Sequence, residues 1–187
     1  MRIIGGTARS RVIKAPEGRD TRPTLDRVRE SVFNILQRHI RDARTLDLYA
    51  GSGAMSLEAL SRGAQSAVLV DCDRAAINAQ KTNVTALRFE NRARILPMED
   101  KQAIRLLCGE KAQFDLVFLD PPYAMHDLSG VMAALVPLLA PDALIVLEHS
   151  SSVMPSTADG FVMTDSRRYG AATVSFFQMI DPAPKEE

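Results

Sequence analysis

Residues 114–123 read Phe114-Asp115-Leu116-Val117-Phe118-Leu119-Asp120-Pro121-Pro122-Tyr123. The first six residues are mostly bulky and apolar, which is typical of a buried strand. Two consecutive prolines cannot continue a strand, because neither has an N–H group to donate and each fixes its own φ angle. The strand therefore ends at Asp120, and a carboxylate, a rigid turn and an aromatic ring follow at its carboxyl end. In open α/β sheets, ligands bind at this edge.

A carboxylate beside a planar ring suits a flat group that carries an amine, such as a nucleobase. Residues 120–123 alone are equally compatible with a tight turn that carries a surface tyrosine. The other motifs of the chain have to decide between these two interpretations.

Strand and helix patterns alternate around this stretch. The expected strands are Thr45–Tyr49, Ser66–Asp71, Arg94–Pro97, Phe114–Asp120 and Ala143–Glu148. The expected helices between them are Ser56–Arg62, Arg74–Leu87, Asp100–Cys108 and Leu128–Leu139. This alternation predicts right-handed crossovers and a doubly wound, mostly parallel, Rossmann-like α/β sheet. Phe161–Thr164 and Thr173–Ile180 leave no room for a crossover helix, so they predict an antiparallel C-terminal hairpin at the sheet edge.

Residues 1–23 are predicted to form a small basic β-hairpin that extends the main domain, because Gly5 and Gly6 separate two short strand-like stretches. Residues 24–181 form the main domain, and residues 182–187 are expected to be a disordered tail. Thr24 can cap the first helix of the domain. The helical spacing of its apolar residues predicts one packed face, made of Leu25, Val28, Val32, Ile35, Leu36 and His39.

The 187 residues carry 23 basic and 23 acidic side chains, so the net charge indicates no partner. Residues 1–44, however, contain eleven Arg or Lys against five Asp or Glu. This basic end favours an anionic partner that contacts one end of the molecule; a solvated helix face with a basic tail is the alternative. The two cysteines and three scattered histidines predict neither a disulfide framework nor a metal site. With no signal-peptide core and no uninterrupted apolar span, a cytoplasmic protein is expected.

A second motif lies at residues 46–53, where Leu46-Asp47-Leu48-Tyr49-Ala50-Gly51-Ser52-Gly53 predicts a strand, a glycine turn and the start of a helix. Gly51 and Gly53 allow the backbone to approach a ligand, and the N–H groups of the next helix face it. Ser56 stands where a dinucleotide-binding motif has its third glycine. Asp47 would repel a pyrophosphate but suits a ligand with a positive amino group. These features argue against a nicotinamide dehydrogenase.

Two further acids follow at the ends of the next strands. Asp71 lies 20 residues after Gly51, where a carboxylate can accept hydrogen bonds from both hydroxyls of a ribose. Glu99 or Asp100 ends the third strand and can meet the edge of an adenine. Together with Asp47, these acids describe a nucleoside that bears an amino acid, which is S-adenosylmethionine.

The order of these motifs resembles that of amino-group methyltransferases that act on nucleic acids. More specifically, four blocks resemble the bacterial small-subunit (16S) ribosomal RNA guanine-N2 methyltransferases: residues 2–6, 22–24, 27–36 and 58–64. The resemblance extends from residue 2 to about residue 177. Ser10, Tyr49 and Asp71 stand where the family usually has Gly, Phe and Glu.

The resemblance implies methyl transfer from S-adenosylmethionine to the exocyclic 2-amino group of a guanine in small-subunit ribosomal RNA. It also implies a monomer that acts within a ribosomal particle and needs no metal. The catalytic residues would be Asp120, Pro121, Pro122 and Tyr123. The cofactor would be bound by Asp47, Tyr49, Ala50, Gly51, Ser52, Gly53, Asp71, Cys72, Glu99, Asp100, Asp120 and Thr24. The RNA would be bound by Arg2, Arg9, Arg11, Lys14, Arg22 and Arg27.

In the expected mechanism, Asp120 and the Pro121 carbonyl accept the two N–H bonds of the amine, and Tyr123 stacks on the base, which is worth roughly 1–3 kcal/mol. Two alternatives remain. A DNA adenine amino-methyltransferase uses the same chemistry but usually carries a separate target-recognition region. A non-catalytic RNA- or nucleotide-binding module would not need the intact Asp47 and Asp120.

Overall fold

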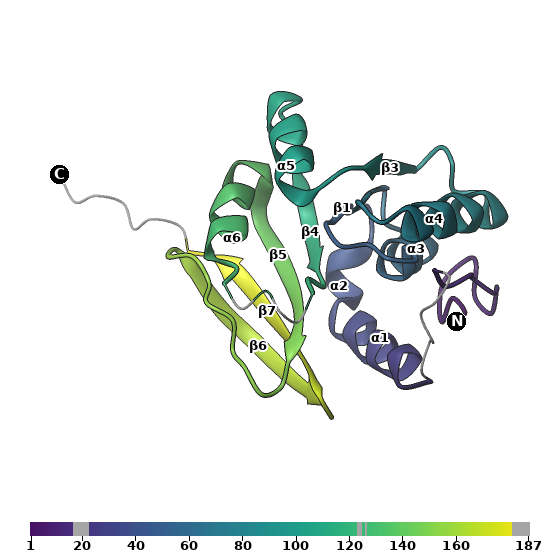
Figure 1. Cartoon of the computed structure of the whole chain (residues 1–187). Coiled ribbons are helices and arrows are strands. Elements are labelled where there is room, and N and C mark those ends of the chain that lie inside the picture. The colour runs from purple at the N-terminus through teal and green to yellow at the C-terminus, as the bar shows by residue number, and fades with distance from the viewer. Residues whose placement is uncertain (17–22, 123–124, 126, 181–187) are drawn as a thin grey trace.

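The computed structural model shows a seven-stranded sheet with helices on both faces (Figure 1). It describes residues 1–16, 23–122, 125 and 127–180, and only the backbone of residues 23–25. The strands are β1 Arg44–Asp47, β2 Ser66–Asp71, β3 Ala93–Pro97, β4 Phe114–Leu119, β5 Leu139–Ser150, β6 Phe161–Tyr169 and β7 Ala172–Met179. The helices are α1 Pro23–Ile35, α2 Gln37–Ile40, α3 Ala54–Ser61, α4 Arg74–Leu87, α5 Asp100–Gly109 and α6 Ser129–Leu135, followed by the 3-10 turn η1 Val136–Leu138.

The strand order is β3-β2-β1-β4-β5-β7-β6. Strands β1 to β5 pair in parallel, and β7 pairs antiparallel with both β5 and β6. The predicted α/β class, with a mostly parallel sheet and an antiparallel C-terminal hairpin, is therefore confirmed. The direction in which successive strands are added reverses between β1 and β4, and open α/β sheets bind their ligands at such a point.

Two hydrophobic cores lie on the two faces of the sheet. One core packs α1, α3 and α4 against the sheet through residues such as Val32, Leu57 and Val84. The other packs α5 and α6 through residues such as Ile104 and Met132. The buried apolar area of both faces explains why the central strands are apolar along almost their whole length. No helix among the described residues is long and apolar enough to cross a membrane.

Two helix predictions were wrong in detail. The first helix ends at Ile35, and the Leu36 backbone has ψ −2°, which tightens the turn before α2. The His39 N–H then bonds to the Leu36 carbonyl at 2.7 Å, three residues back, so the helical phase shifts and both Ile35 and His39 are exposed. The helix expected to reach Leu139 stops at Leu135, because Pro137 has no N–H to continue the ladder. Strand β5 begins in its place.

The N-terminal segment forms the expected hairpin, but with a single antiparallel bridge between Arg2 and Val12. The Ile3 N–H bonds to the Arg11 carbonyl at 2.9 Å, and the Ser10 N–H bonds to the Ile3 carbonyl at 2.8 Å. Ile3 and Ile13 are buried in the same core as α1 and α3. The hairpin is thus packed into the main domain, and its predicted boundary at residue 23 stays a prediction because residues 17–22 lie outside the described part.

Candidate active site: a cleft at the carboxyl ends of the parallel strands

A cleft of about 740 Å³ runs along the carboxyl ends of the central strands. One part of it, here called the cofactor half, lies at the ends of β1, β2 and β3 and is lined by Asp47, Leu48, Tyr49, Ala50, Gly51, Ser52, Asp71, Cys72, Asp73, Met98, Glu99 and Asp100. The other part, the target half, is lined by residues of α1, β4, β5 and β7 with the turn after β4, namely Val28, Arg29, Val32, Phe118, Leu119, Asp120, Pro121, Pro122, Val146, Glu148 and Val174. The structure thus brings together in one cleft most of the residues that the sequence singled out.

Asp47 is buried at the end of β1, with 2% of its surface exposed. Its carboxylate accepts a hydrogen bond from the Ser56 hydroxyl at 3.0 Å. Burial raises the pKa of Asp47 from an ordinary 3.8 to about 7, although the Ser56 hydroxyl opposes the shift. Ser56, which stands where a dinucleotide motif has its third glycine, therefore supports the acid of the site. A buried carboxylate of this kind can neutralise a positive amino group that enters the cleft.

The glycine turn is held from α4 by two buried amides. Gln80 donates a hydrogen bond to the Gly51 carbonyl at 3.0 Å, and Asn83 donates one to the Ser52 carbonyl at 2.9 Å. Gly51 has φ 53°, and a Cβ built on it would meet nothing within 4 Å, so its backbone faces open space. Gly53 has φ 80°, and a Cβ there would lie 2.7 Å from Leu69. The turn is therefore both fixed in shape and open toward the cleft, which suits the approach of a ligand.

Asp71 lies at the end of β2 and lines the cleft. One carboxylate oxygen accepts the Gly51 N–H at 2.9 Å, and the other accepts the Asp73 N–H at 2.9 Å. Each oxygen keeps a further lone pair, so the carboxylate can also accept hydrogen bonds from a ribose. Asp71 thus ties the glycine turn to the second strand.

The third acid position is organised around Asp100. The Tyr49 hydroxyl donates a hydrogen bond to its carboxylate at 2.7 Å, and the Lys101 N–H donates another at 2.6 Å. Burial, together with the Asp100 carboxylate, raises the pKa of Tyr49, so the phenol stays protonated. Glu99 precedes α5 at the N-cap position without a side-chain capping hydrogen bond; it is exposed and also lines the cleft. The geometry keeps both Glu99 and Asp100 within the cofactor half.

The predicted catalytic turn follows β4 directly. Asp120 is exposed at the rim of the cleft, Pro121 is buried, and Pro122 is exposed. Tyr123 lies outside the described residues, as does Arg22. The expected cap at Thr24 is wrong in position, because α1 begins at Pro23 and Thr24 is already its second residue; the side chain of Thr24 is not described.

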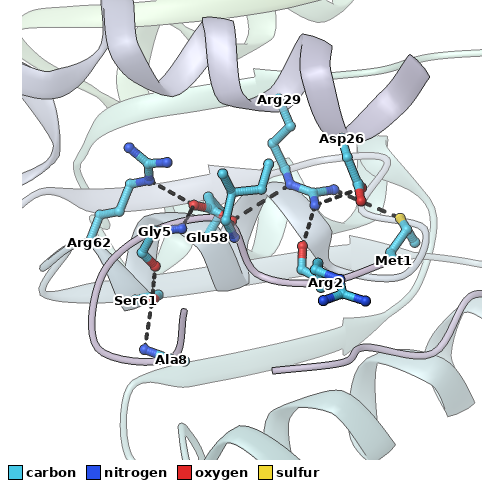
Figure 2. Close-up of polar contacts among 10 residues, drawn as sticks. Met1, Arg2, Gly5, Ala8, Asp26, Arg29, Glu58, Ser61 and Arg62 are labelled. Carbon is cyan, nitrogen blue, oxygen red and sulfur yellow. Dashed lines mark hydrogen bonds and ion pairs between the residues drawn. The ribbon is translucent and has the colours of Figure 1, made fainter. Parts of the chain in front are cut away.

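The N-terminal segment is fastened to α3 by a fully buried carboxylate (Figure 2). Glu58 accepts hydrogen bonds from the backbone N–H groups of Ile4 and Gly5, both at 2.8 Å. It also pairs with Arg62 at 2.7 Å and with Arg29 at 3.7 Å. The Arg29 guanidinium, 4% exposed, reaches on to the Arg2 carbonyl at 2.6 Å and to Asp26 at 3.0 Å.

The glycine pair of this segment has a steric reason. A Cβ on Gly6 would lie 1.9 Å from the Ser61 carbonyl oxygen, and one on Gly5 would lie 2.7 Å from the Arg62 guanidinium. Ser61 completes the contact, since its hydroxyl donates to the Gly5 carbonyl at 2.6 Å and accepts the Ala8 N–H at 2.9 Å (Figure 2). The blocks at residues 2–6, 27–36 and 58–64 therefore meet in space as one anchor.

Five of the predicted RNA-binding residues lie in the described part of the chain. Arg2, Arg9, Arg11, Lys14 and Arg27 are all exposed. Arg11 also donates a hydrogen bond to the Ala86 carbonyl of α4, which holds its side chain against the domain. Met1 and Pro16 line the cleft, so this basic segment lies next to its target half.

Sequence reasoning missed several residues of the site. Glu148, at the carboxyl end of β5, lines the cleft beside the turn that follows β4. Glu58, Arg29, Gln80 and Asn83 are polar but almost fully buried, and each fixes backbone near the cleft. A charged residue inside an apolar helical pattern was the available signal for Glu58, because buried charges need partners. Among the described residues, no group of three or more His, Cys, Asp or Glu could hold a metal ion.

Comparisons with known proteins agree with this geometry. The sequence profile of a family described as "Conserved hypothetical protein 95" matches residues 1–178. The ribosomal RNA small subunit methyltransferase D of Escherichia coli (strain K12) is 41% identical over 150 residues, which cover 79% of this chain and 74% of that protein. YlbH of Bacillus subtilis is 36% identical over 181 residues, which cover 95% of this chain and 98% of that protein.

The chain belongs to this family of ribosomal RNA methyltransferases. The solved structure of yhhF from Escherichia coli has the same fold, with a TM-score of 0.82, 34% identity, and coverage of 97% of this chain and 99% of that one. The predicted family is therefore confirmed, and so, at the level of the family, is a methyltransferase that uses S-adenosylmethionine. The residues of the cofactor half fit such a molecule, because they combine a buried acid, an open glycine turn and two further acids at strand ends.

Proposed function

We propose that this chain transfers a methyl group from S-adenosylmethionine to the exocyclic 2-amino group of a guanine in small-subunit ribosomal RNA. One observation carries the proposal: the turn at Asp120, Pro121 and Pro122 shares a single cleft with the glycine turn that follows β1. The family relationship and the name of the Escherichia coli relative support ribosomal RNA as the substrate.

In the proposed binding mode, the cofactor half holds the cofactor. Asp47 neutralises its amino group, the turn at Gly51 lies against its amino-acid part, Asp71 accepts its ribose hydroxyls, and Glu99 or Asp100 meets its adenine. When bound, the cofactor supplies a methyl group on a positively charged sulfur. The protein then has to supply alignment and the exclusion of water.

The target half aligns the base. The exocyclic amine of guanine is a poor nucleophile because its lone pair is conjugated with the ring. The Asp120 carboxylate and the Pro121 carbonyl accept its two N–H bonds and turn the lone pair toward the methyl group. In this orientation the nitrogen would accept the methyl group, and it would then release its proton to solvent. Val28, Phe118 and Val146 give this half an apolar surface that keeps water away.

The RNA would be positioned by exposed cations beside the target half. Arg2, Arg9 and Lys14 can contact phosphates, which fixes orientation without reading sequence. Because the base must enter a cleft, it has to be unpaired or flipped out of a helix. A short chain with this arrangement favours a pre-shaped substrate, and we propose a ribosomal particle that a monomer of the enzyme recognises by its form.

The test measures incorporation of radiolabelled methyl groups by the purified protein. Its substrates are small subunits rebuilt from unmodified ribosomal RNA, the same RNA free of protein, and duplex DNA. We expect incorporation into the subunits, with mass spectrometry of the digested RNA yielding N2-methylguanosine at one position. Incorporation into adenine of duplex DNA would instead support the DNA amino-methyltransferase, and RNA binding without any transfer would support a non-catalytic module.

A further inference from the structure

Glu148 occupies the target half of the cleft from a strand next to the catalytic turn. In the parallel pair of β4 and β5, Leu119 lies opposite Leu147. Continuing this register by one residue brings Asp120 opposite Glu148, and neighbouring strands lie roughly 4.8 Å apart. Both residues line the cleft. Two carboxylates from adjacent strands therefore border the place where the target base would lie.

The surroundings of Glu148 are apolar. On β5, Val146 lies two residues earlier and so shares its face of the sheet, and Val174 of β7 pairs with Glu148 directly. Val146 and Val174 belong to the same buried core as Val28 and Val32 of α1. This burial raises the pKa of Glu148, although the neighbouring His149 opposes the shift.

The Glu148 carboxylate has no hydrogen bond or ion pair within the described part of the chain. The side chain is half-buried and its oxygens are not among the fully buried atoms, so they remain accessible to a ligand in the cleft. In these apolar surroundings, a ligand that brings a hydrogen-bond donor into the target half would form a stronger bond with the carboxylate than it could in open water. The carboxylates of Asp120 and Glu148 would together fit a base edge that carries two neighbouring N–H donors.

Guanine has such an edge, because its N1–H lies next to its 2-amino group. Adenine has an acceptor at N1, whose lone pair would face the carboxylate. We propose that Glu148 determines the specificity of the target half: its carboxylate accepts the N1–H of the guanine whose 2-amino group is held by Asp120 and the Pro121 carbonyl. This inference rests on the proposed function and adds to it the residue that separates guanine from other purines.

The test compares two bases that share the reacting amine. A small-subunit RNA is assembled by ligation with either guanine or 2,6-diaminopurine at the position that the wild-type enzyme methylates. 2,6-Diaminopurine keeps the 2-amino group but has an acceptor at N1. Since a hydrogen bond to a charged group is worth roughly a ten- to hundred-fold effect, we expect the wild-type enzyme to favour guanine by at least that ratio of kcat/KM.

Two variants test whether the preference for guanine over 2,6-diaminopurine depends on Glu148. Glu148→Gln keeps the size of the side chain, and its amide can donate to the N1 of 2,6-diaminopurine, so the preference for guanine should fall by roughly ten- to a hundred-fold. Glu148→Ala should lower the ratio as well, mainly through slower transfer to guanine. Should the alanine variant fail to fold, the isosteric glutamine variant carries the test. Calorimetric affinity for S-adenosylmethionine should stay at the wild-type value in both.

The control is Glu110→Gln, which removes an exposed carboxylate that pairs with Arg94 far from the cleft. It should keep the wild-type ratio. A wild-type enzyme indifferent to the two bases, or Glu148 variants that slow both substrates equally, would overturn the inference while leaving guanine methylation intact. A wild-type enzyme that methylates no guanine in any RNA would instead overturn the proposed function.

Discussion

The two halves of the cleft are built in different ways. In the cofactor half, Asp47, Asp71 and Asp100 each accept hydrogen bonds from the protein itself. In the target half, Glu148 faces apolar neighbours without such a partner among the described residues. The first half is made from three consecutive strand ends, whereas the second combines α1, β4, β5 and β7, which are far apart in the chain.

The two kinds of carboxylate suit different tasks: one holds a ligand in a fixed geometry, and the other selects among ligands. Carboxylates that are already bonded are held in place before a ligand arrives, so binding costs little further ordering. A carboxylate in apolar surroundings gains most from one particular donor and rejects a ligand that lacks it. Under the proposed function, the cofactor half is thus prepared for a molecule that many enzymes share, and the target half for the base that this enzyme would select.

The largest expected effect comes from Asp120→Ala. Loss of this acceptor should lower the rate of methyl transfer by roughly a hundred- to a thousand-fold, a loss typical for a group aligned with the reacting atoms. The affinity for S-adenosylmethionine, measured by calorimetry, should change only a few fold, because the cofactor half is intact. Near-normal turnover would rule out the proposed role of Asp120 and the idea that the target half aligns the base.

Next comes Glu58→Gln, which tests how the target half is held. Removing the charge leaves Arg29 and Arg62 without their buried partner, and breaking such a pair costs about 3–5 kcal/mol in the free energy of unfolding. Urea denaturation measures it. Among molecules that remain folded, RNA methylation should suffer more than cofactor binding, because Arg29 lines the target half and Met1 lines the cleft. Glu110→Gln, which removes an exposed ion pair, should change the free energy of unfolding by less than about 1 kcal/mol.

A smaller effect is expected from Asp71→Ala. The loss of hydrogen bonds from a carboxylate to the ribose and to the Gly51 N–H should weaken S-adenosylmethionine binding by roughly ten- to a hundred-fold. At a saturating cofactor concentration, the rate of methyl transfer should recover most of its wild-type value. If calorimetry finds unchanged affinity, Asp71 does not contact the ribose.

Asp47→Asn is expected to change the pH dependence of the free energy of unfolding. The folded protein holds a proton on Asp47 up to about pH 7, whereas the unfolded chain releases it near 3.8. Between these values the folded state binds more protons, so the free energy of unfolding of the cofactor-free wild type should fall as pH rises, relative to the variant. Chemical denaturation of both proteins from about pH 4 to about pH 8 covers the interval between the two pKa values, and the difference between the two curves isolates the contribution of Asp47. Parallel curves would show that Asp47 ionises normally.

Local features of the sequence predicted much of the cofactor half. The glycine turn, the two prolines and the acids at the strand ends depend on backbone conformations that nearby residues impose, so their order along the chain could be interpreted directly. The helical phase after Ile35 could not be predicted from the sequence, because the tightened turn at Leu36 depends on packing. The length of β5 could not either, since its first residues pair only once β4 lies beside them.

The sequence by itself determined the α/β fold, the family and the strand ends that line the cleft, because strand ends, turns and characteristic blocks are encoded by residues close together in the chain. Only the tertiary structure decided which charges are exposed and which hold the protein together. Arg27 and Arg29 are two residues apart, yet one is exposed and the other is buried against Glu58. Glu58 itself bonds to Ile4, 54 positions away. Contacts over such separations depend on how the elements pack, and only packing placed Glu148 beside the catalytic turn.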